Sequence, residues 1–155
     1  MDDGLRLLDN LPGLDDYRRL RAVSGLTPVT EDQARPALAN AWGGCHVVDA
    51  SGAVVAMGRV LGDGGWYFHI TDIATDPDHQ RRGLGTAVVQ RLLTLIVDAA
   101  PPHPYITLMA DPPGRALYES MGFETTKSTG MVQTAIRRGE PAPAGAVRGP
   151  GTRPS

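Results

Sequence analysis

The chain has 155 residues, of which 41% are hydrophobic and 21% charged, with a formal net charge of -2; this fits one soluble domain with a hydrophobic core and gives no electrostatic basis for binding nucleic acid or a membrane surface. Cys45 is the only cysteine, so no internal disulfide can form, and we expect a small buried residue there and a cytoplasmic protein. We find neither a signal-peptide pattern nor an apolar run of the roughly 18 residues that a membrane helix needs.

The first predicted elements are helical. Residues 14–24, LDDYRRLRAVS, have apolar residues at helical spacing, acids early and arginines late, and a glycine follows them. In TEDQARPALANAW, Thr30 followed three residues later by Gln33 is a capping-box pattern. Pro36 would remove a helical hydrogen bond, so we expect either two short helices or one irregular helix in this segment.

A run of strands follows the helices. The segment CHVVDASGAVVAMGRVL contains two β-rich stretches around DASG, which is typical of a hairpin. GDGG at 62–65 predicts a second turn, and WYFHITDIAT at 66–75 predicts a third strand. Together these segments predict an antiparallel meander.

Helices and strands alternate in the next part of the chain. An amphipathic helix is expected through about Val97, and PPHP ends it. YITLMA at 105–110 predicts a strand, GRALYESM a short helix, and FETTKSTGMVQTAI at 123–136 a final hairpin. Because strand–helix–strand units are right-handed, the strand at 105–110 should run parallel to the one at 66–75.

This order of elements predicts an α+β fold with a mixed sheet. From residue 139 the sequence is GEPAPAGAVRGPGTRPS, which has almost no large apolar residue. We therefore expect one domain over residues 1–138 and a disordered tail over residues 139–155.

The loop before the long helix has the clearest chemical signal. QRRGLG at 80–85 places two glycines at a helix start, where backbone N–H groups have no intrahelical acceptor and the dipole is positive. Glycines admit a ligand close to the backbone and arginines add charge, so the loop predicts a phosphate or pyrophosphate site. A P-loop needs lysine and Ser/Thr after its last glycine, where this chain has Thr86 and Ala87, so a P-loop is disfavoured. A dinucleotide fingerprint needs a third glycine where this chain has Val88, so it is disfavoured as well. A tight turn without a ligand is the alternative.

Two motifs together resemble a known family. QRRGLG at 80–85 matches the Q/R-x-x-G-x-G/A signature of the GNAT superfamily of acetyl-CoA-dependent N-acetyltransferases, and LYESMGF at 117–123 is similar to its segment LYxxxGF. The resemblance covers roughly residues 14–136. It implies a GNAT fold with flanking helices and a mixed, mostly antiparallel sheet of about six to seven strands, in which the central parallel pair splays apart.

The chain also resembles one branch of that family, the plant and cyanobacterial serotonin (arylalkylamine) acetyltransferase-like proteins. The shared features are an LR-containing helix near the start, GRVLGDG before the signature strand, and TDIATDP leading into the loop. This closer resemblance implies an arylalkylamine or a similar small molecule as the acceptor.

The family resemblance implies acetyl-CoA as the cosubstrate. Its pyrophosphate would be held by the backbone N–H groups of the loop, which are those of Arg81, Arg82, Gly83, Leu84, Gly85 and Thr86. Its pantetheine arm would bind like an added strand along Ile73, Ala74 and Thr75. The histidines are scattered and there is one cysteine, so we expect no metal site.

Acyl transfer from a thioester to an amine needs a base for the amine proton and gains from an acid at the departing sulfur. The resemblance implies that Tyr118 of LYxxxGF is the acid; a tyrosine packing a short helix on the sheet is the alternative. His69 is the first candidate base, because imidazole accepts protons near neutral pH. Asp111 is its rival, although it could instead form the turn of DPP, and Asp72 is a weaker candidate.

Two further expectations concern positions in the sheet. Strand alternation would place His69, Thr71 and Ile73 on one face and Phe68, Ile70 and Asp72 on the other. Trp42, Trp66, Tyr67 and Phe68 could wall a pocket for an aromatic amine, although core packing would explain them equally.

Three functions follow in order of preference. The first is acetylation of a small-molecule primary amine by direct transfer. The second is acetylation of a protein N-terminus or lysine, and the third is a non-catalytic acetyl-CoA-binding module. A homodimer is compatible with the final hairpin acting as an edge.

Overall fold

The computed structural model describes residues 4–133, and the chain divides into two compact units, 1–123 and 124–155. The first unit contains the helices and strands of the described residues, in the order β1 (Arg6–Leu8), α1 (Leu14–Val23), α2 (Glu31–Ala39), β2 (Gly43–Val48), β3 (Val54–Gly62), β4 (Tyr67–Thr75), η1 (Pro77–His79), α3 (Leu84–Ala99), β5 (Tyr105–Leu108), η2 (Pro112–Gly114) and α4 (Arg115–Ser120). Among residues 4–133, no helix has the length and apolar character to cross a membrane.

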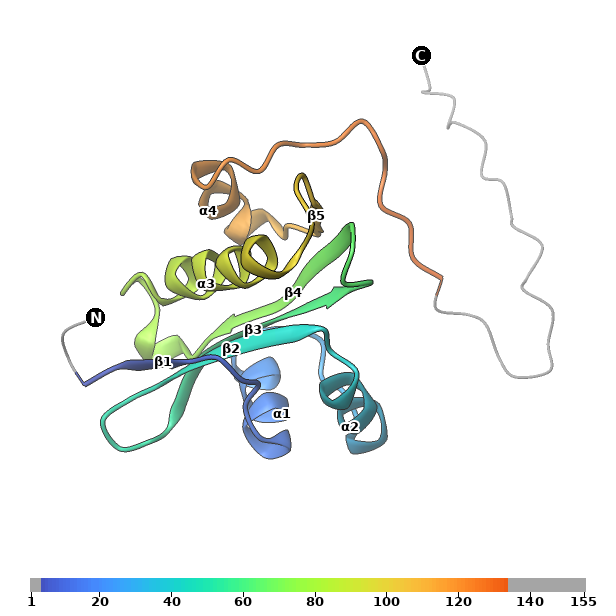
Figure 1. Ribbon diagram of the computed structural model, residues 1–155. Coiled ribbons are helices and arrows are strands. Elements are labelled where there is room, and N and C mark those ends of the chain that lie inside the picture. Colours follow the sequence, from blue (N-terminus) through green and yellow to red (C-terminus); the bar gives the residue numbers. More distant parts are fainter. Residues whose placement is uncertain (1–3, 134–155) are drawn as a thin grey trace, which may run out of the picture. The chain divides into compact units, whose positions relative to one another are not determined.

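A mixed sheet with the order β1-β2-β3-β4-β5 forms the centre of the first unit. Strands β1 to β4 pair antiparallel, and β5 pairs parallel to β4. This confirms the predicted meander and the predicted parallel pair. Figure 1 shows α3 and α4 over one face of the sheet and α1 and α2 over the other.

Each face of the sheet has its own apolar cluster. On the α3 face, the helix buries residues spaced by about one turn against the strands, including Leu84, Val88, Leu92 and Ile96. On the α1 face, Tyr17 and Leu20 pack with residues of α2, β3 and β4. Burial of each such side chain stabilises the fold by about 1.5–3 kcal/mol, so both helical layers are held on the sheet by apolar packing.

The capping box predicted for α2 is present. The Thr30 hydroxyl accepts a hydrogen bond from the Gln33 N–H at 3.3 Å, and the Gln33 side chain accepts one from the Thr30 N–H at 2.9 Å. Pro36 lies inside the helix, so the segment is one helix that lacks one N–H donor. The boundaries of α1 also agree with the sequence prediction.

The predicted sheet of six to seven strands is wrong for the part of the chain described, which has five. One of the five, β1, was not predicted, because three residues are too few to show alternation. The predicted hairpin over 123–136 is absent as far as residue 133, since residues 124–133 contain no helix or strand. There the Thr126 hydroxyl accepts the Ser128 N–H at 2.8 Å, a local bond that competes with strand pairing.

Two predictions about the C-terminal part are not addressed by the described residues. The end of the predicted hairpin, residues 134–136, and the predicted disordered tail, residues 139–155, lie outside them. The predicted boundary of the domain at residue 138 therefore stays a prediction.

Candidate active site

A pocket of about 500 Å³ lies where the pairing of β4 with β5 ends. The two strands pair from Tyr67 and Tyr105 to Ile70 and Leu108, and β4 then continues alone on that side. The lining comes from the end of α1, the α1–α2 loop, the middle of β4, the end of β5 with the residues that follow it, and α4. It brings together the titratable candidates predicted from the sequence, which are His69, Asp72, Asp111 and Tyr118.

His69 projects from β4 into this lining. Its Nδ1 lies 2.9 Å from Oγ1 of Thr107, the residue opposite it in the parallel register of β5. Burial lowers the pKa of His69 below its ordinary value, and the negative charge of Asp72 opposes this only in part. The ring is therefore neutral at neutral pH, which is the state that can accept a proton.

Tyr118 reaches the pocket from α4. Its ring packs edge-on against Phe123, with centroids 6.1 Å apart, and against the α3-face core. A Cβ on Gly114 would lie 3.2 Å from Cε2 of Tyr118, so the glycine makes room for the ring. Burial, and then the charge of Asp111, raise the pKa of Tyr118 above its ordinary value, so the hydroxyl keeps its proton at neutral pH and can act as an acid.

Asp111 also lines the pocket, and it precedes η2. Its backbone carbonyl accepts a hydrogen bond from the Gly114 N–H at 2.9 Å, while its side chain makes no capping bond. The residue thus forms the DPP turn through its backbone and leaves its carboxylate exposed at the pocket. The turn is therefore observed, and the role of the carboxylate as a base or as a site for a cationic amine stays a prediction.

Asp72 is not placed as strand alternation predicts. The pairs Arg59↔Thr71 and Met57↔Ala74 leave one residue of β3 opposite two of β4, which is a bulge, and Asp72 has φ +57°. As a result Ile73 packs on the α3 face with the core, and Asp72 turns toward α1. The predicted grouping of Ile73 with His69 on one face is therefore wrong.

The carboxylate of Asp72 accepts hydrogen bonds from four side chains. Oδ2 accepts from Tyr17 Oη at 2.7 Å and from Arg59 Nε, and Oδ1 accepts from Arg21 Nη1 at 2.5 Å and from Thr71 Oγ1 at 3.2 Å. Burial alone would raise the pKa of Asp72, but hydrogen bonds from Arg59 and Tyr17 and the charges of Arg59 and Arg21 lower it overall. A carboxylate held in this way is a weak base, so the pocket favours His69 or Asp111 for that role.

The predicted cofactor strand, from Ile73 to Thr75, is the end of β4. On one side Ala74 and Thr75 pair with β3. On the other side the β5 pairing has already ended. Backbone groups on that edge can therefore bond to an extended ligand as to an added strand.

The glycine loop has the geometry that an anion site requires. Gly83 is the N-cap of α3 with φ +78°, and a Cβ there would meet no atom within 4 Å. The first helical hydrogen bond runs from Ala87 N–H to the Gly83 carbonyl at 3.0 Å, so the N–H groups of Leu84, Gly85 and Thr86 have no intrahelical acceptor. Leu84 is buried, with 2% of its surface exposed, and its side chain packs in the core on the α3 face.

The loop also touches the helix that carries Tyr118. A Cβ on Gly85 would lie 3.5 Å from Cδ2 of Leu117 in α4. Arg81, with φ +59°, and Arg82 precede the glycines on the exposed side of the turn. The residues present thus fit a phosphate-bearing cofactor that extends from the start of α3.

The four aromatic residues considered for a pocket wall or for core packing fall into two groups, and none of them lines the pocket. Phe68 is fully buried and meets Trp42 edge-on at 4.8 Å on the α3 face. Trp66 and Tyr67 are instead exposed, and both pack with Tyr105, at 5.2 and 5.3 Å between centroids. Tyr67 and Tyr105 lie at the start of β4 and β5, two residues before His69 and Thr107, and Trp66 immediately precedes β4.

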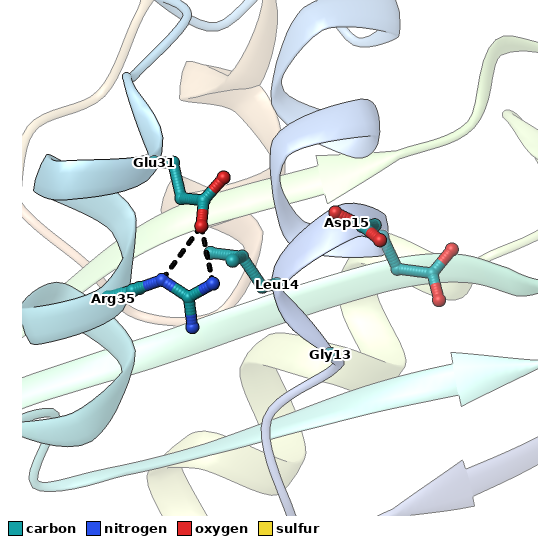
Figure 2. A pocket seen from close by; sticks show the side chains of 6 residues that line it. Gly13, Leu14, Asp15, Glu31 and Arg35 are labelled. Carbon is teal, nitrogen blue, oxygen red and sulfur yellow. Dashed lines mark hydrogen bonds and ion pairs between the residues drawn. The ribbon is translucent and has the colours of Figure 1, made fainter.

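A second hollow, of about 430 Å³, lies at the first turns of α1 and α2 and is lined by Gly13, Leu14, Asp15, Asp16, Glu31 and Arg35. Figure 2 shows Glu31 bonded to Arg35 of the same helix. None of the candidate site residues line this hollow. Within residues 4–133 there is also no group of three or more metal-ligating side chains.

Comparison with known proteins identifies the family to which this fold belongs. The sequence model of the Acetyltransferase (GNAT) family matches residues 14–123. The chain belongs to this family, and it is an N-acetyltransferase by class.

Individual relatives agree with the assignment. A protein of unknown function from meticillin-resistant Staphylococcus aureus, described as "Probable Acetyltransferase", has a TM-score of 0.79 and 32% identity over 84% of this chain and 98% of its own. A GNAT family protein from Streptococcus pneumoniae shares the fold, with a TM-score of 0.71 and 24% identity over 86% and 98% of the two chains. The "Uncharacterized N-acetyltransferase ycf52" of Pyropia yezoensis is 33% identical over 75 residues, which is 48% of this chain and 42% of that protein.

Proposed function

We propose that this enzyme moves an acetyl group directly from acetyl-CoA to a primary amine of a small molecule. The observation that carries the proposal is the convergence of His69 and Tyr118, from β4 and α4, on one pocket. The imidazole is neutral and the phenol is protonated at neutral pH, which are the states that a base and an acid need. Holding both substrates in one pocket would add the advantage of proximity.

In the proposed reaction the amine nitrogen forms a bond to the thioester carbonyl carbon as the carbon–sulfur bond breaks. His69 takes the proton that the amine loses. Tyr118 gives its proton to the departing sulfur, so that the products are the N-acetylated amine and the free thiol of coenzyme A. Asp111, exposed at the pocket, is the alternative base, or it attracts a cationic amine.

Acetyl-CoA is supported as the donor by the loop that opens α3. The unpaired N–H groups after Gly83 and the charge of Arg81 suit a pyrophosphate. The unpaired edge of β4 from Ile73 to Thr75 suits the pantetheine arm. A bound acetyl-CoA would supply the activated acetyl group, and these residues would orient it.

An arylalkylamine is the acceptor that we favour. The sequence resembles the serotonin acetyltransferase-like branch, and the exposed aromatic residues Trp66, Tyr67 and Tyr105 lie near the start of β4 and β5, the strands that carry His69 and Thr107. Stacking on such rings contributes about 0.5–1.5 kcal/mol beyond area burial. We further propose that the enzyme works in the cytoplasm without a nucleic acid or membrane partner; a homodimer is compatible with this.

Release of the coenzyme A thiol tests the function. The purified chain is mixed with acetyl-CoA and a panel of phenethylamine, tryptamine, spermidine, an aminoglycoside and a peptide. We expect the aryl amines to be the best substrates, whereas preference for the peptide would favour the second function. No release with any amine, together with binding of acetyl-CoA, would favour a non-catalytic module.

Binding of the donor is tested separately from turnover. At 100 times its dissociation constant, acetyl-CoA should stabilise the protein by about 2.7 kcal/mol, which a thermal shift measures. Arg81→Ala should weaken this effect, whereas Arg6→Ala, which changes an exposed arginine on β1, should not. No shift with the wild-type protein would refute acetyl-CoA as the ligand.

The proposed role of Tyr118 as the acid is tested by removing its hydroxyl, and a tyrosine on β5 provides the matched control. Tyr118→Phe removes the hydroxyl at the pocket, and we expect kcat to fall by roughly tenfold or more, since an acid contributes about 10²–10⁴-fold. Tyr105→Phe removes a hydroxyl but keeps the exposed ring that is proposed to stack on the amine, so it should leave kcat unchanged. Equal kcat values for the wild type and Tyr118→Phe would exclude Tyr118 as the acid.

A further inference from the structure

We propose that Thr107 of β5 is a positioning residue for His69, one that holds the imidazole in the tautomer with its lone pair on Nε2. The inference rests on the proposed function, in which His69 accepts the amine proton. It adds a residue that no sequence motif marks, on the strand beside the one that carries the base.

The parallel register brings the two side chains together. His69 is paired with Thr107 across β4 and β5, and Oγ1 of Thr107 lies 2.9 Å from Nδ1 of His69. The same Oγ1 lies 3.3 Å from the carbonyl oxygen of Phe68 and 3.3 Å from Oη of Tyr67. Thr107 is therefore the centre of a small polar cluster behind the imidazole.

The directions of the hydrogen bonds in this cluster, in which Thr107 is the donor to Phe68 and Tyr67, favour one tautomer. A threonine hydroxyl has one proton to donate, and the Phe68 carbonyl can only accept. When the Thr107 proton goes to the Phe68 carbonyl or to Oη of Tyr67, Oγ1 can only accept from the imidazole. Nδ1 of His69 then carries the ring proton and donates it to Thr107.

The neutral ring therefore has its lone pair on Nε2. No other part of the described chain forms a hydrogen bond with Nε2, and the ring lines the pocket. The opposite tautomer would present an N–H to the pocket and could not accept the amine proton. Thr107 thus determines which nitrogen faces the substrate.

The charged and titratable groups around the imidazole come from every element that lines the pocket. They are Asp72 on β4, Arg21 on α1, Asp111 after β5 and Tyr118 on α4, with Tyr67 behind Thr107. Burial keeps the pKa of His69 below its ordinary value despite Asp72. At neutral pH the tautomer of the ring, rather than its charge, then determines whether His69 can accept the amine proton.

The test compares Thr107→Val, which keeps the branched shape, with Thr107→Ser, which keeps the hydroxyl. ¹⁵N NMR of the His69 ring nitrogens, in the free full-length protein at pH 8, gives the tautomer without any assay. In the wild type and in Thr107→Ser we expect Nδ1 to be protonated and Nε2 unprotonated. In Thr107→Val we expect a mixture of tautomers.

Kinetics with acetyl-CoA and the best amine of the panel give the second result. We expect Thr107→Val to lower kcat by about five- to tenfold, the value of one hydrogen bond, with the KM of acetyl-CoA unchanged and with recovery in Thr107→Ser. A wild-type protein with Nε2 protonated, or a Thr107→Val variant with unaltered tautomer and kcat, would overturn the proposal.

The His69→Gln variant distinguishes a failure of this inference from a failure of the proposed function. A fully active His69→Gln variant would overturn both the base assignment and the role of Thr107. If His69→Gln is inactive and Thr107→Val is fully active, the function stands and the positioning role of Thr107 is wrong.

Discussion

Nη1 of Arg21 lies 2.5 Å from Oδ1 of Asp72, and this contact joins α1 to the bulge in β4. Tyr17 and Arg59 bond to the same carboxylate. Arg21 also donates from Nε and Nη2 to the carbonyl of Thr27, at 2.9 and 2.7 Å. The α1–α2 loop that lines the pocket is thus tied to the residue that shapes the edge of β4.

The first prediction concerns the stability that this carboxylate provides. Asp72→Asn leaves two arginines without their shared anion, and loss of one partner of such a buried pair costs about 3–5 kcal/mol. Because the folded-state pKa of Asp72 is lowered from 3.8, the stabilisation is complete above that pH and is lost as the pH falls through the folded-state pKa. Urea unfolding at pH 7 should show the full loss, and unfolding at pH 3 a smaller one.

Asp98→Asn is the control, since this exposed aspartate lies near the end of α3. It should change the free energy of unfolding by no more than about 0.5 kcal/mol. An equal loss for Asp72→Asn at both pH values would mean that the charge of the carboxylate is not the source of the stabilisation.

Much of the fold follows from local patterns in the sequence. The capping box at Thr30 and the four-residue spacing from Leu84 to Ile96 predict α2 and α3 because helix formation depends on groups close in the chain. The parallel pairing of β5 follows from the handedness of the crossover. The glycine loop with LYESMGF indicates the family, which the family match confirms.

The parts that could not be predicted depend on contacts between distant segments. Counting alternate residues along β4 fails at Asp72, because a bulge with a left-handed residue leaves no mark in the sequence. Thr107 gains its contact with His69 only through the strand register. The ion pair of Arg59 could have been predicted from the sequence, because a single charged residue within the apolar strand VVAMGRVLG needs a partner of opposite charge.

The second prediction concerns Gly58, which lies opposite the bulge. A Cβ there would lie 2.6 Å from Cδ1 of Ile73 and 2.7 Å from Cγ1 of Val88. Gly58→Ala should therefore destabilise the protein by about 1–3 kcal/mol through overpacking. It should also raise the KM of acetyl-CoA, because Ile73 begins the strand edge proposed to bind the pantetheine arm.

Gly43→Ala on β2 is the matched control, because a Cβ there would meet no atom within 4 Å. Thermal unfolding and steady-state kinetics of both variants check the prediction. If Gly58→Ala has the melting temperature of the wild type, the side chains of Ile73, Val88 and Leu92 around this position move aside without a cost in stability.

The third prediction is that Cys45 does not react in the folded protein. Its side chain is fully buried, and burial raises the pKa of the thiol to about 12. Ellman's reagent at pH 8 should therefore detect no thiol in the native protein and one thiol per chain in guanidinium. Rapid labelling of the native protein would contradict the burial of Cys45, and it would also add a background to the thiol-release assay.

The fourth prediction is the pH profile of kcat at saturating substrates. Burial lowers the pKa of His69 below 6.5, so kcat should rise with pH through a midpoint below that value as the base loses its proton. Burial and Asp111 raise the pKa of Tyr118 above 10, so kcat should fall only at a pH above 10, as the acid is lost. His69→Gln should remove the rise at low pH and Tyr118→Phe the fall at high pH, each at a lower plateau. A low-pH midpoint that His69→Gln leaves in place would instead assign the rise to another group, and Asp111→Asn would then be the variant to measure.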